Sequence, residues 1–209
     1  GTGLGAENGI LIKSGEALEK AHKLTTVVFD KTGTLTKGEP SVTDLVPADG
    51  TDVEHLLQIA AIAEKGSEHP IGEAIVKKFE EMKKTIPNVK NYETVPGKGI
   101  RCTYLNKEIL VGNRNFLSEN KINTSVVEEK ILRLEEEGKT VVFVSYGKNL
   151  LGAIAVADTL KEFSKEAVAT LQRMGKEIIM ITGDNERTAN AIAKQLGINR
   201  VLAKVLPGE

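Results

Sequence analysis

The sequence predicts an α/β domain that is interrupted after its first strand by an inserted α+β domain. After Asp158, apolar strands alternate with amphipathic helices, which is typical of a parallel sheet. A similar apolar strand, 25–30, stands alone near the start of the chain. The stretch between these two parts instead combines short strands, tight turns and amphipathic helices, which is typical of an antiparallel sheet with helices packed on it.

The first part of the chain should hold one helix and one strand. Ser14 can cap a helix that runs to about Lys23, with Ala17, Leu18 and Ala21 on one face. The β-branched run 25–30 predicts a buried strand that ends on a carboxylate, and the residues that follow it, 31–34, turn the chain away.

The middle of the chain predicts three helices and several short strands. Asp52 can cap a helix to about Lys65, and Pro70 suits the first position of another helix. A third helix contains Val127, Ile131 and Leu134 and is stopped by Gly138. The expected strands are 41–46, 91–95, 100–105, 108–111, 140–146 and 150–157.

The last part returns to the strand and helix alternation. Apolar residues at helical spacing predict a helix that Gly175 ends, a strand over 177–182, a second helix that Gly197 ends, and a strand at 201–203. The first of these helices should present Phe163, Ala167, Val168 and Leu171 on its apolar face. These boundaries divide the chain into 1–36, 37–156 and 157–209, in which the first and third segments form one domain.

Composition limits the classes of protein to which the chain can belong. It has 209 residues, 40% of them hydrophobic and 27% charged, so it can bury a core without crosslinks. A single cysteine, Cys102, excludes a disulfide scaffold and favours a reducing compartment. The net charge of −1 gives no indication of a nucleic-acid partner. No apolar run approaches the ~20 residues that cross a bilayer, and no signal peptide opens the chain. We expect a soluble piece of a larger protein, because the chain opens at Gly1 without a Met and stops at Leu206-Pro207-Gly208-Glu209.

Two strands of the predicted parallel sheet end on polar loops, 30–34 and 182–184. The carboxyl ends of parallel strands lie at one edge of the sheet, where ligands bind. Asp30 could attack a phosphorus atom and form an aspartyl phosphate, with Lys31 as a nearby cation and Gly33 in a backbone cradle for the anion. Thr182 could donate its hydroxyl to the phosphoryl oxygens. Mg²⁺ would have to bridge Asp30 and those oxygens, since two anions otherwise repel each other.

These residues resemble known motifs. Asp30-Lys31-Thr32-Gly33-Thr34-Leu35-Thr36 resembles the phosphorylation motif of P-type ATPases, and Thr182-Gly183-Asp184 matches the second motif of that family. The family belongs to the haloacid dehalogenase-like superfamily, whose parallel sheet is Rossmann-like. The resemblance implies that the catalytic residues are Asp30, Lys31, Thr32, Thr182, Gly183 and Asp184, and that Asp30 and Thr32 hold Mg²⁺.

The inserted part carries a second group of motifs. Ser67-Glu68-His69-Pro70 resembles the histidine-proline motif of the heavy-metal-transporting branch, and Gly97-Lys98-Gly99 resembles the glycine pair beside its nucleotide. Glycines allow close backbone approach to a ligand, and a Glu and a His can hydrogen-bond a purine edge. The resemblance implies that ATP is bound by Glu64, His69, Gly97, Gly99, Ile100 and Asn113, with Glu64 and His69 facing the adenine.

The resemblance also implies a function. The chain is similar to the nucleotide-binding and phosphorylation domains of an ATP-driven transmembrane heavy-metal pump, on the cytoplasmic side of the cell membrane. The forms Ser-Glu-His-Pro and Ala203-Lys204-Val205-Leu206-Pro207-Gly208 favour copper over zinc or cadmium. The implied partners are ATP, a transported metal cation held by membrane segments, and a metallochaperone or metal-binding domain of the same pump. No nucleic acid is expected.

Three other functions are compatible with parts of this sequence. A zinc or cadmium pump is the alternative within the family. A soluble phosphatase of the superfamily would carry an acid/base Asp two positions after the nucleophile, where this chain has Thr32. A pure nucleotide-binding module would not need the loop that begins at Asp30.

Two further residues or motifs bear on activity. Asp158 lies where the chain re-enters the first domain; the resemblance places it near the hinge and the phosphorylation site, and a helix N-cap is the other interpretation. The later family motif Gly-Asp-Gly-x-Asn-Asp, which helps to hold Mg²⁺, is not in the sequence. We therefore expect the chain to bind ATP but to turn it over poorly.

Overall fold

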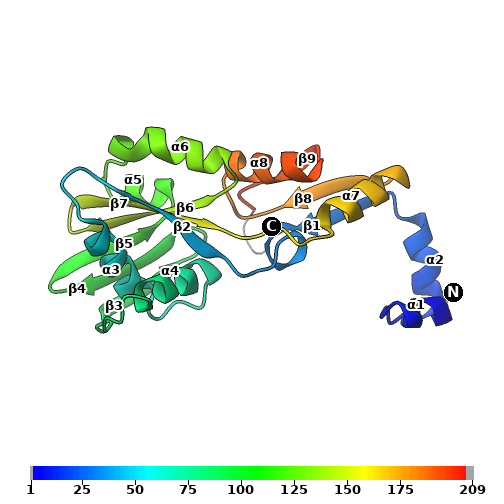
Figure 1. Ribbon diagram of the computed structural model, residues 1–209, viewed down its shortest axis with the longest axis horizontal. Coiled ribbons are helices and arrows are strands. Elements are labelled where there is room, and N and C mark those ends of the chain that lie inside the picture. Colours follow the sequence, from blue (N-terminus) through cyan, green and yellow to red (C-terminus); the bar gives the residue numbers. More distant parts are fainter. Residues whose placement is uncertain (1, 206–209) are drawn as a thin grey trace.

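The computed structural model describes residues 2–205, so the ending Leu206–Glu209 lies outside the described residues. Figure 1 shows an elongated molecule in which two sheets follow one another along the long axis. Two helices, α1 (Thr2–Glu7) and α2 (Gly15–Lys23), lie at the end that carries the N-terminus. None of the helices among residues 2–205 has the length and the apolar character needed to cross a membrane.

The smaller sheet is parallel, as the sequence predicts. Its strands are β1 (Thr26–Asp30), β8 (Glu177–Ile181) and β9 (Arg200–Leu202), in the order β1-β8-β9. Helices α7 (Ser164–Arg173) and α8 (Glu186–Leu196) both pack against the face that carries Ile178 and Met180. This arrangement confirms the α/β fold class for the part of the chain outside the insert.

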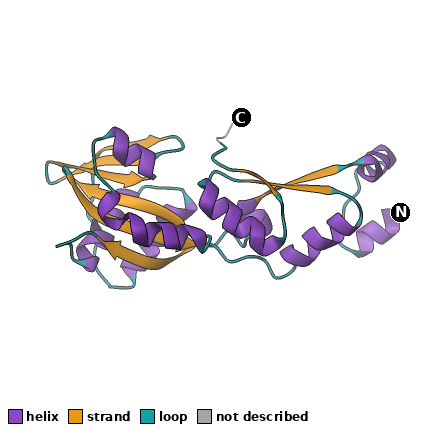
Figure 2. Ribbon diagram, turned by 90° about the horizontal axis from the view of Figure 1, so that it is seen from above, coloured by secondary structure: helices purple, strands orange, loops and turns teal. Residues whose placement is uncertain are grey.

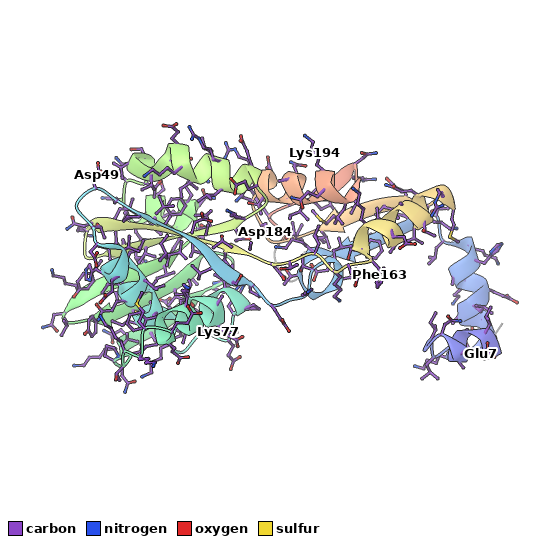
Figure 3. The ribbon with its side chains drawn as sticks, viewed as in Figure 1. Glu7, Asp49, Lys77, Phe163, Asp184 and Lys194 are labelled. Carbon is purple, nitrogen blue, oxygen red and sulfur yellow. The ribbon has the colours of Figure 1, made fainter. Side chains whose placement is uncertain are left out.

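On the opposite face of the parallel sheet no helix packs among the described residues, although Ile179 of the central strand β8 is itself buried. Val28 of β1 is 53% exposed and Leu202 of β9 is 43% exposed. The prediction of a buried first strand is therefore wrong for this face, because both helices lie on the other side. Phe163, which was predicted to join the apolar face of a helix, instead precedes α7 and is exposed (Figure 3).

Helix α2 begins as predicted but packs differently. The Ser14 hydroxyl oxygen accepts a hydrogen bond from the Ala17 N–H at 3.1 Å, which caps the helix. No residue of α2 is buried. The apolar face predicted for Ala17, Leu18 and Ala21 thus covers no core among the described residues.

The larger sheet is antiparallel and has six strands in the order β2-β7-β6-β5-β4-β3. Figure 2 shows it at the end of the molecule that lies away from the N-terminus. Every neighbouring pair is antiparallel, so the predicted α+β insert is confirmed. The strands are β2 (Ser41–Pro47), β3 (Lys90–Val95), β4 (Gly99–Tyr104), β5 (Lys107–Gly112), β6 (Thr140–Tyr146) and β7 (Asn149–Ala157).

Helices cover both faces of this sheet. Helices α3 (Val53–Glu64) and α4 (Pro70–Glu80) pack on one face, and α5 (Arg114–Glu119) and α6 (Glu128–Glu136) pack on the other. A short 3₁₀ turn, Ser125–Val127, leads into α6. The sequence did not predict α5, because six residues are too few to show a helical period.

Two linkers join the sheets and run side by side. The Lys37 N–H donates to the Thr159 carbonyl at 2.8 Å. The Asp158 carboxylate accepts from the Thr36 hydroxyl at 2.6 Å and from the backbone N–H groups of Gly38 and Glu39. Asp158 therefore fastens one linker to the other and is not the helix N-cap considered above, since α7 begins only at Ser164. The division into 1–36, 37–156 and 157–209 stays a proposal that this pairing of linkers supports.

Candidate functional site

Asp30 stands exposed at the carboxyl end of β1, and a tight turn, Lys31–Leu35, follows it. Gly33 has a φ of +75°, which a side chain disfavours, and a Cβ built on it would meet no atom within 4 Å. The turn thus leaves open space beside Asp30. Thr32 is exposed in the same turn.

The turn is held from both sides. The Thr36 hydroxyl oxygen accepts from the Gly33 N–H at 3.2 Å, and the Thr36 N–H donates to the Lys31 carbonyl. From the returning chain, Lys161 Nζ donates to the Gly33 carbonyl at 2.7 Å and Ser164 Oγ donates to the Leu35 carbonyl at 2.8 Å. These bonds fix the backbone that follows Asp30.

The second polar loop meets the first at the same sheet edge, as predicted. Asp30 is in register with Ile181, so Thr182 and Gly183 follow directly beside it. Lys31 Nζ lies 2.6 Å from Asp184 Oδ2, and both side chains are almost fully buried. Thr182 Oγ1 donates to the same oxygen at 2.9 Å. Figure 3 shows Asp184 at the junction of the two sheets.

The charge of Asp184 is stabilised by these contacts. Burial by itself would raise the pKa of Asp184. The charge and hydrogen bond of Lys31, helped by the hydroxyls of Thr140 and Thr182, outweigh burial and hold that pKa below its ordinary value. Lys31 and Asp184 therefore form an ion pair beside Asp30.

A magnesium site can be tested against this donor set. No group of three or more His, Cys, Asp or Glu side chains in residues 2–205 is arranged to hold a metal ion. Mg²⁺ commonly uses only one or two carboxylates, with water and substrate phosphates completing its shell. The exposed Asp30 carboxylate with Thr32 beside it fits that mode, whereas Asp184 is already paired with Lys31.

The insert places Glu64 at the end of α3, where its side chain is buried against α4. A Cβ on Gly72 would lie 2.3 Å from Glu64 Oε2, so only glycine at position 72 admits the carboxyl group. Burial raises the pKa of Glu64 to about 7, although a hydrogen bond with Ser67 acts in the opposite direction. Glu64 therefore titrates near neutral pH.

His69 immediately precedes α4. The following proline favours extended backbone at His69, whose ψ is 134°, and this allows the ring to cap the helix. Its Nδ1 accepts from the Ile71 N–H at 3.2 Å, so the neutral ring carries its proton on Nε2. Partial burial is the main cause that lowers the pKa of His69; Asp184 opposes this and Lys31 adds to it. His69 therefore lies within electrostatic range of the Lys31–Asp184 pair.

The glycine pair predicted for the nucleotide lies in the turn before β4. Gly97 has a φ of +68°. A Cβ on Gly99 would lie 2.1 Å from the Val111 carbonyl oxygen, so β4 and β5 meet there more closely than a side chain permits. Asn113 holds this turn, since its Nδ2 donates to the Gly97 carbonyl at 2.8 Å while its Oδ1 caps α5. A direct contact between Asn113 and a nucleotide stays a prediction.

Ile100 and Cys102 follow Gly99 on β4, and both are buried. Burial, with a smaller effect of the Glu64 charge, raises the pKa of Cys102 to about 11. Glu64 is therefore close to the inner face of β4, while Gly97 and Gly99 lie at the start of that strand. The thiol of Cys102 is unreactive at neutral pH.

Sequence reasoning assigned no role to several residues that shape these two sites. Ser67 and Gly72 surround Glu64, and Thr36 closes the turn after Asp30. Of these residues, Gly72 could have been identified from the sequence, because it lies two positions after Pro70 in the predicted helix. Thr140 Oγ1 donates to Asp184 Oδ1 at 2.7 Å across 44 residues of sequence, and no local pattern indicates that contact.

Comparison with known proteins gives three findings. The family model described as haloacid dehalogenase-like hydrolase matches residues 24–208. The chain is 47% identical over 207 residues to the copper-exporting P-type ATPase of Bacillus subtilis (strain 168), covering 99% of this chain and 26% of that protein. It is also 47% identical over 210 residues to the copper-exporting P-type ATPase of Staphylococcus aureus (strain bovine RF122 / ET3-1), with 100% and 26% covered. The chain thus spans about a quarter of the length of these relatives.

Solved structures give the same picture. A structure of the catalytic domain of the CPx-ATPase CopB-B, which reports its conformational changes upon nucleotide binding, superposes with a TM-score of 0.71 at 27% identity, covering 96% of this chain and 69% of that one. A zinc-transporting PIB-type ATPase in the E2.Pi state superposes with a TM-score of 0.67 at 37% identity, covering 99% of this chain and 33% of the other. The similarity therefore includes both sheets and not the parallel sheet alone.

Proposed function

Since this chain belongs to the haloacid dehalogenase-like hydrolases, we propose that it is the nucleotide-binding and phosphorylation part of a copper-exporting P-type ATPase. The observation that carries the proposal is the edge of the parallel sheet, where an exposed Asp30 stands beside the Lys31–Asp184 ion pair. Identity of 47% to copper-exporting pumps over nearly the whole chain supports the choice of pump.

ATP is proposed to bind to the insert, between the end of α3, the start of α4 and the glycine turn before β4. His69 would donate from Nε2 to a purine acceptor, because Nδ1 is occupied by the cap of α4. The buried Glu64 would accept from the exocyclic amine when ionised or donate when protonated. Gly97, Gly99 and Ile100 would then line the nucleotide, with Asn113 holding their turn in place.

Asp30 is proposed as the nucleophile. One of its carboxylate oxygens attacks the γ-phosphorus of ATP, the bond from that phosphorus to the β,γ-bridging oxygen breaks, and ADP leaves with the electron pair. Lys31 offsets negative charge at the phosphoryl oxygens, and the open space above Gly33 accommodates them. Bound Mg²⁺, held by Asp30 and Thr32, would supply the charge neutralisation that lets two anions approach.

The residues after Asp30 do not fit a soluble phosphatase. Water attack on an aspartyl phosphate needs a base, and the position two residues after Asp30 holds Thr32, whose hydroxyl is not basic. A long-lived phosphoenzyme suits a pump, which uses the phosphorylated state to drive domain motion. We accordingly propose a place on the cytoplasmic side of a membrane, with copper bound by other segments of the pump and delivered by a metallochaperone or metal-binding domain.

The choice of transported metal rests on sequence identity to other pumps. The zinc-transporting ATPase is 37% identical, and the copper-exporting pumps are 47% identical over a similar share of the chain. Copper therefore remains the preferred cargo, and zinc or cadmium the alternative.

Incubation with γ-labelled ATP and Mg²⁺, followed by acid quench, tests the proposal. We expect a low yield of protein-bound label that hydroxylamine releases, and no such label in Asp30→Asn. Label that resists hydroxylamine, or that persists in Asp30→Asn, would contradict Asp30 as the nucleophile. Near-stoichiometric label lost in Asp30→Asn would support Asp30 and contradict the expected poor turnover.

A further inference from the structure

Helix α6 of the insert and helix α8 of the parallel-sheet domain lie end to end along one side of the molecule (Figure 1). Glu135 in the last turn of α6 is only 2% exposed, which is uncommon for a carboxylate unless it is paired. Its Oε1 accepts from Asn185 Nδ2 at 3.1 Å, and its Oε2 accepts from Arg187 Nη1 at 3.3 Å. Arg114 of the insert reaches Oε1 at 3.2 Å. One buried carboxylate thus joins the two domains.

The contact continues past the end of α6. Thr188 of α8 is fully buried, and its Oγ1 donates to the Lys139 carbonyl at 2.8 Å. Gly138 has a φ of +83°, and a Cβ there would lie 2.8 Å from Cδ1 of Ile192. Ile192 of α8 thus packs against the glycine that follows the end of α6.

This interface delivers a hydroxyl to the phosphorylation site. Thr140 follows Lys139 directly, and its Oγ1 donates to Asp184 Oδ1 at 2.7 Å. The other oxygen of Asp184 holds Lys31. A donor on one carboxylate oxygen restrains rotation of the group, so Oδ2 stays directed at the ammonium. A shift of the insert by 1 Å or so would break a hydrogen bond of this length.

We propose that α6 and α8 form an interdomain latch centred on Glu135, and that the closed latch makes Thr140 a positioning residue for the Lys31–Asp184 pair. The latch stands on geometry alone, whereas the importance of Lys31 for phosphoryl transfer rests on the function proposed above. Through Thr140, the orientation of the insert controls how firmly Lys31 is held beside Asp30.

Distances between spin labels test the latch in the full 209-residue chain. Labels on Lys77→Cys of α4 and Lys194→Cys of α8 report across the interface (both residues are labelled in Figure 3), and the buried Cys102 does not compete for the reagent. We expect one narrow distance distribution, and a broadened one in Glu135→Ala and in Arg187→Ala. Glu129→Ala is the matched control, because exposed Glu129 pairs with Arg133 of its own helix and with no other residue that the structure describes.

Distributions that match the unsubstituted chain in both latch variants would overturn the latch. The Arg187 side chain is 52% exposed, so we expect Arg187→Ala to fold. If Glu135→Ala does not fold, Arg187→Ala by itself decides whether the latch exists.

The ammonium signal of Lys31 in nitrogen-15 NMR spectra tests the role of Thr140. A buried, paired ammonium exchanges slowly with water, so we expect a visible signal in the unsubstituted chain. Thr140→Val has nearly the same shape but no hydroxyl and should lose the signal, as should Glu135→Ala, while Thr140→Ser should keep it. An unchanged signal in Thr140→Val would overturn the positioning role. Neither measurement involves ATP, so failure of the proposed function and failure of the latch give separate results.

Discussion

The two sheets differ in how completely they are covered. The six-stranded sheet has a core on each face, one under α3 and α4 and one under α5 and α6. The three-stranded sheet has one core, under α7 and α8, and its other face exposes Val28 and Leu202. The region proposed to bind nucleotide is thus a closed unit, whereas the region that carries Asp30 is supported on one side only among the described residues.

This difference indicates that the two regions hold their site residues in place in different ways. A unit with both faces buried keeps Glu64, His69 and the glycine turn in fixed relation without help from its neighbour. The phosphorylation turn instead depends on long-range contacts, namely those of Lys161, Ser164 and Asp184. The following predictions use this contrast, beginning with the largest expected effect.

Excision of the insert should separate the two regions completely. Residues 37–156, which contain the antiparallel sheet apart from the last residue of β7, should fold alone and bind ATP about as well as the full chain, because the linkers leave and return side by side. Circular dichroism and calorimetric titration check this. An unfolded piece, or a folded one that does not bind ATP, would contradict the proposed boundaries.

Truncation of a core residue should affect the insert strongly. Phe79 of α4 is fully buried, so Phe79→Ala should lower the free energy of unfolding by ~3–5 kcal/mol. Val28→Ala on the uncovered face should cost less than ~1 kcal/mol, since its side chain already contacts solvent. Native-state hydrogen exchange measures each region separately. Equal losses from the two changes would remove the contrast between the sheets.

The pKa of Glu64 predicts a pH dependence confined to the insert. Because that pKa rises from 4.5 to about 7 on folding, the folded chain binds a proton that the unfolded chain has lost. The associated stability is complete below about pH 4.5 and disappears as the pH rises through 7. The difference is at most roughly 3 kcal/mol.

Urea unfolding at pH 5 and pH 8 measures this effect. Glu64→Gln should be more stable than the unsubstituted chain at pH 8 and should lose less stability between the two values. Glu129→Gln, at an exposed site, is the control. Identical pH profiles for Glu64→Gln and the unsubstituted chain would show that Glu64 is not protonated on folding.

Local sequence patterns predicted much of this molecule. Asp52 caps α3, Pro70 starts α4 and Gly197 ends α8, because each of these signals acts within one turn of helix. The meeting of Asp30 and Thr182 followed from the direction of parallel strands alone.

Features that depend on distant segments were not predictable in this way. Asp158 binds backbone groups about 120 residues away, and Thr140 reaches Asp184 from the other domain. The exposure of Val28 and Phe163 likewise depends on the face of the parallel sheet against which α7 and α8 pack. The apolar pattern of a strand or helix does not specify that face.

Calorimetric titration of the 209-residue chain with ATP tests the central claim most directly. We expect binding that is unchanged in Asp30→Asn and severalfold weaker in His69→Gln and His69→Asn, since one hydrogen bond contributes ~0.5–1.5 kcal/mol. His69→Asn is the sharper variant, because asparagine can still cap α4 but lacks the Nε2 donor. Absence of ATP binding, or affinity in both His69 variants equal to that of the unsubstituted chain, would contradict the account.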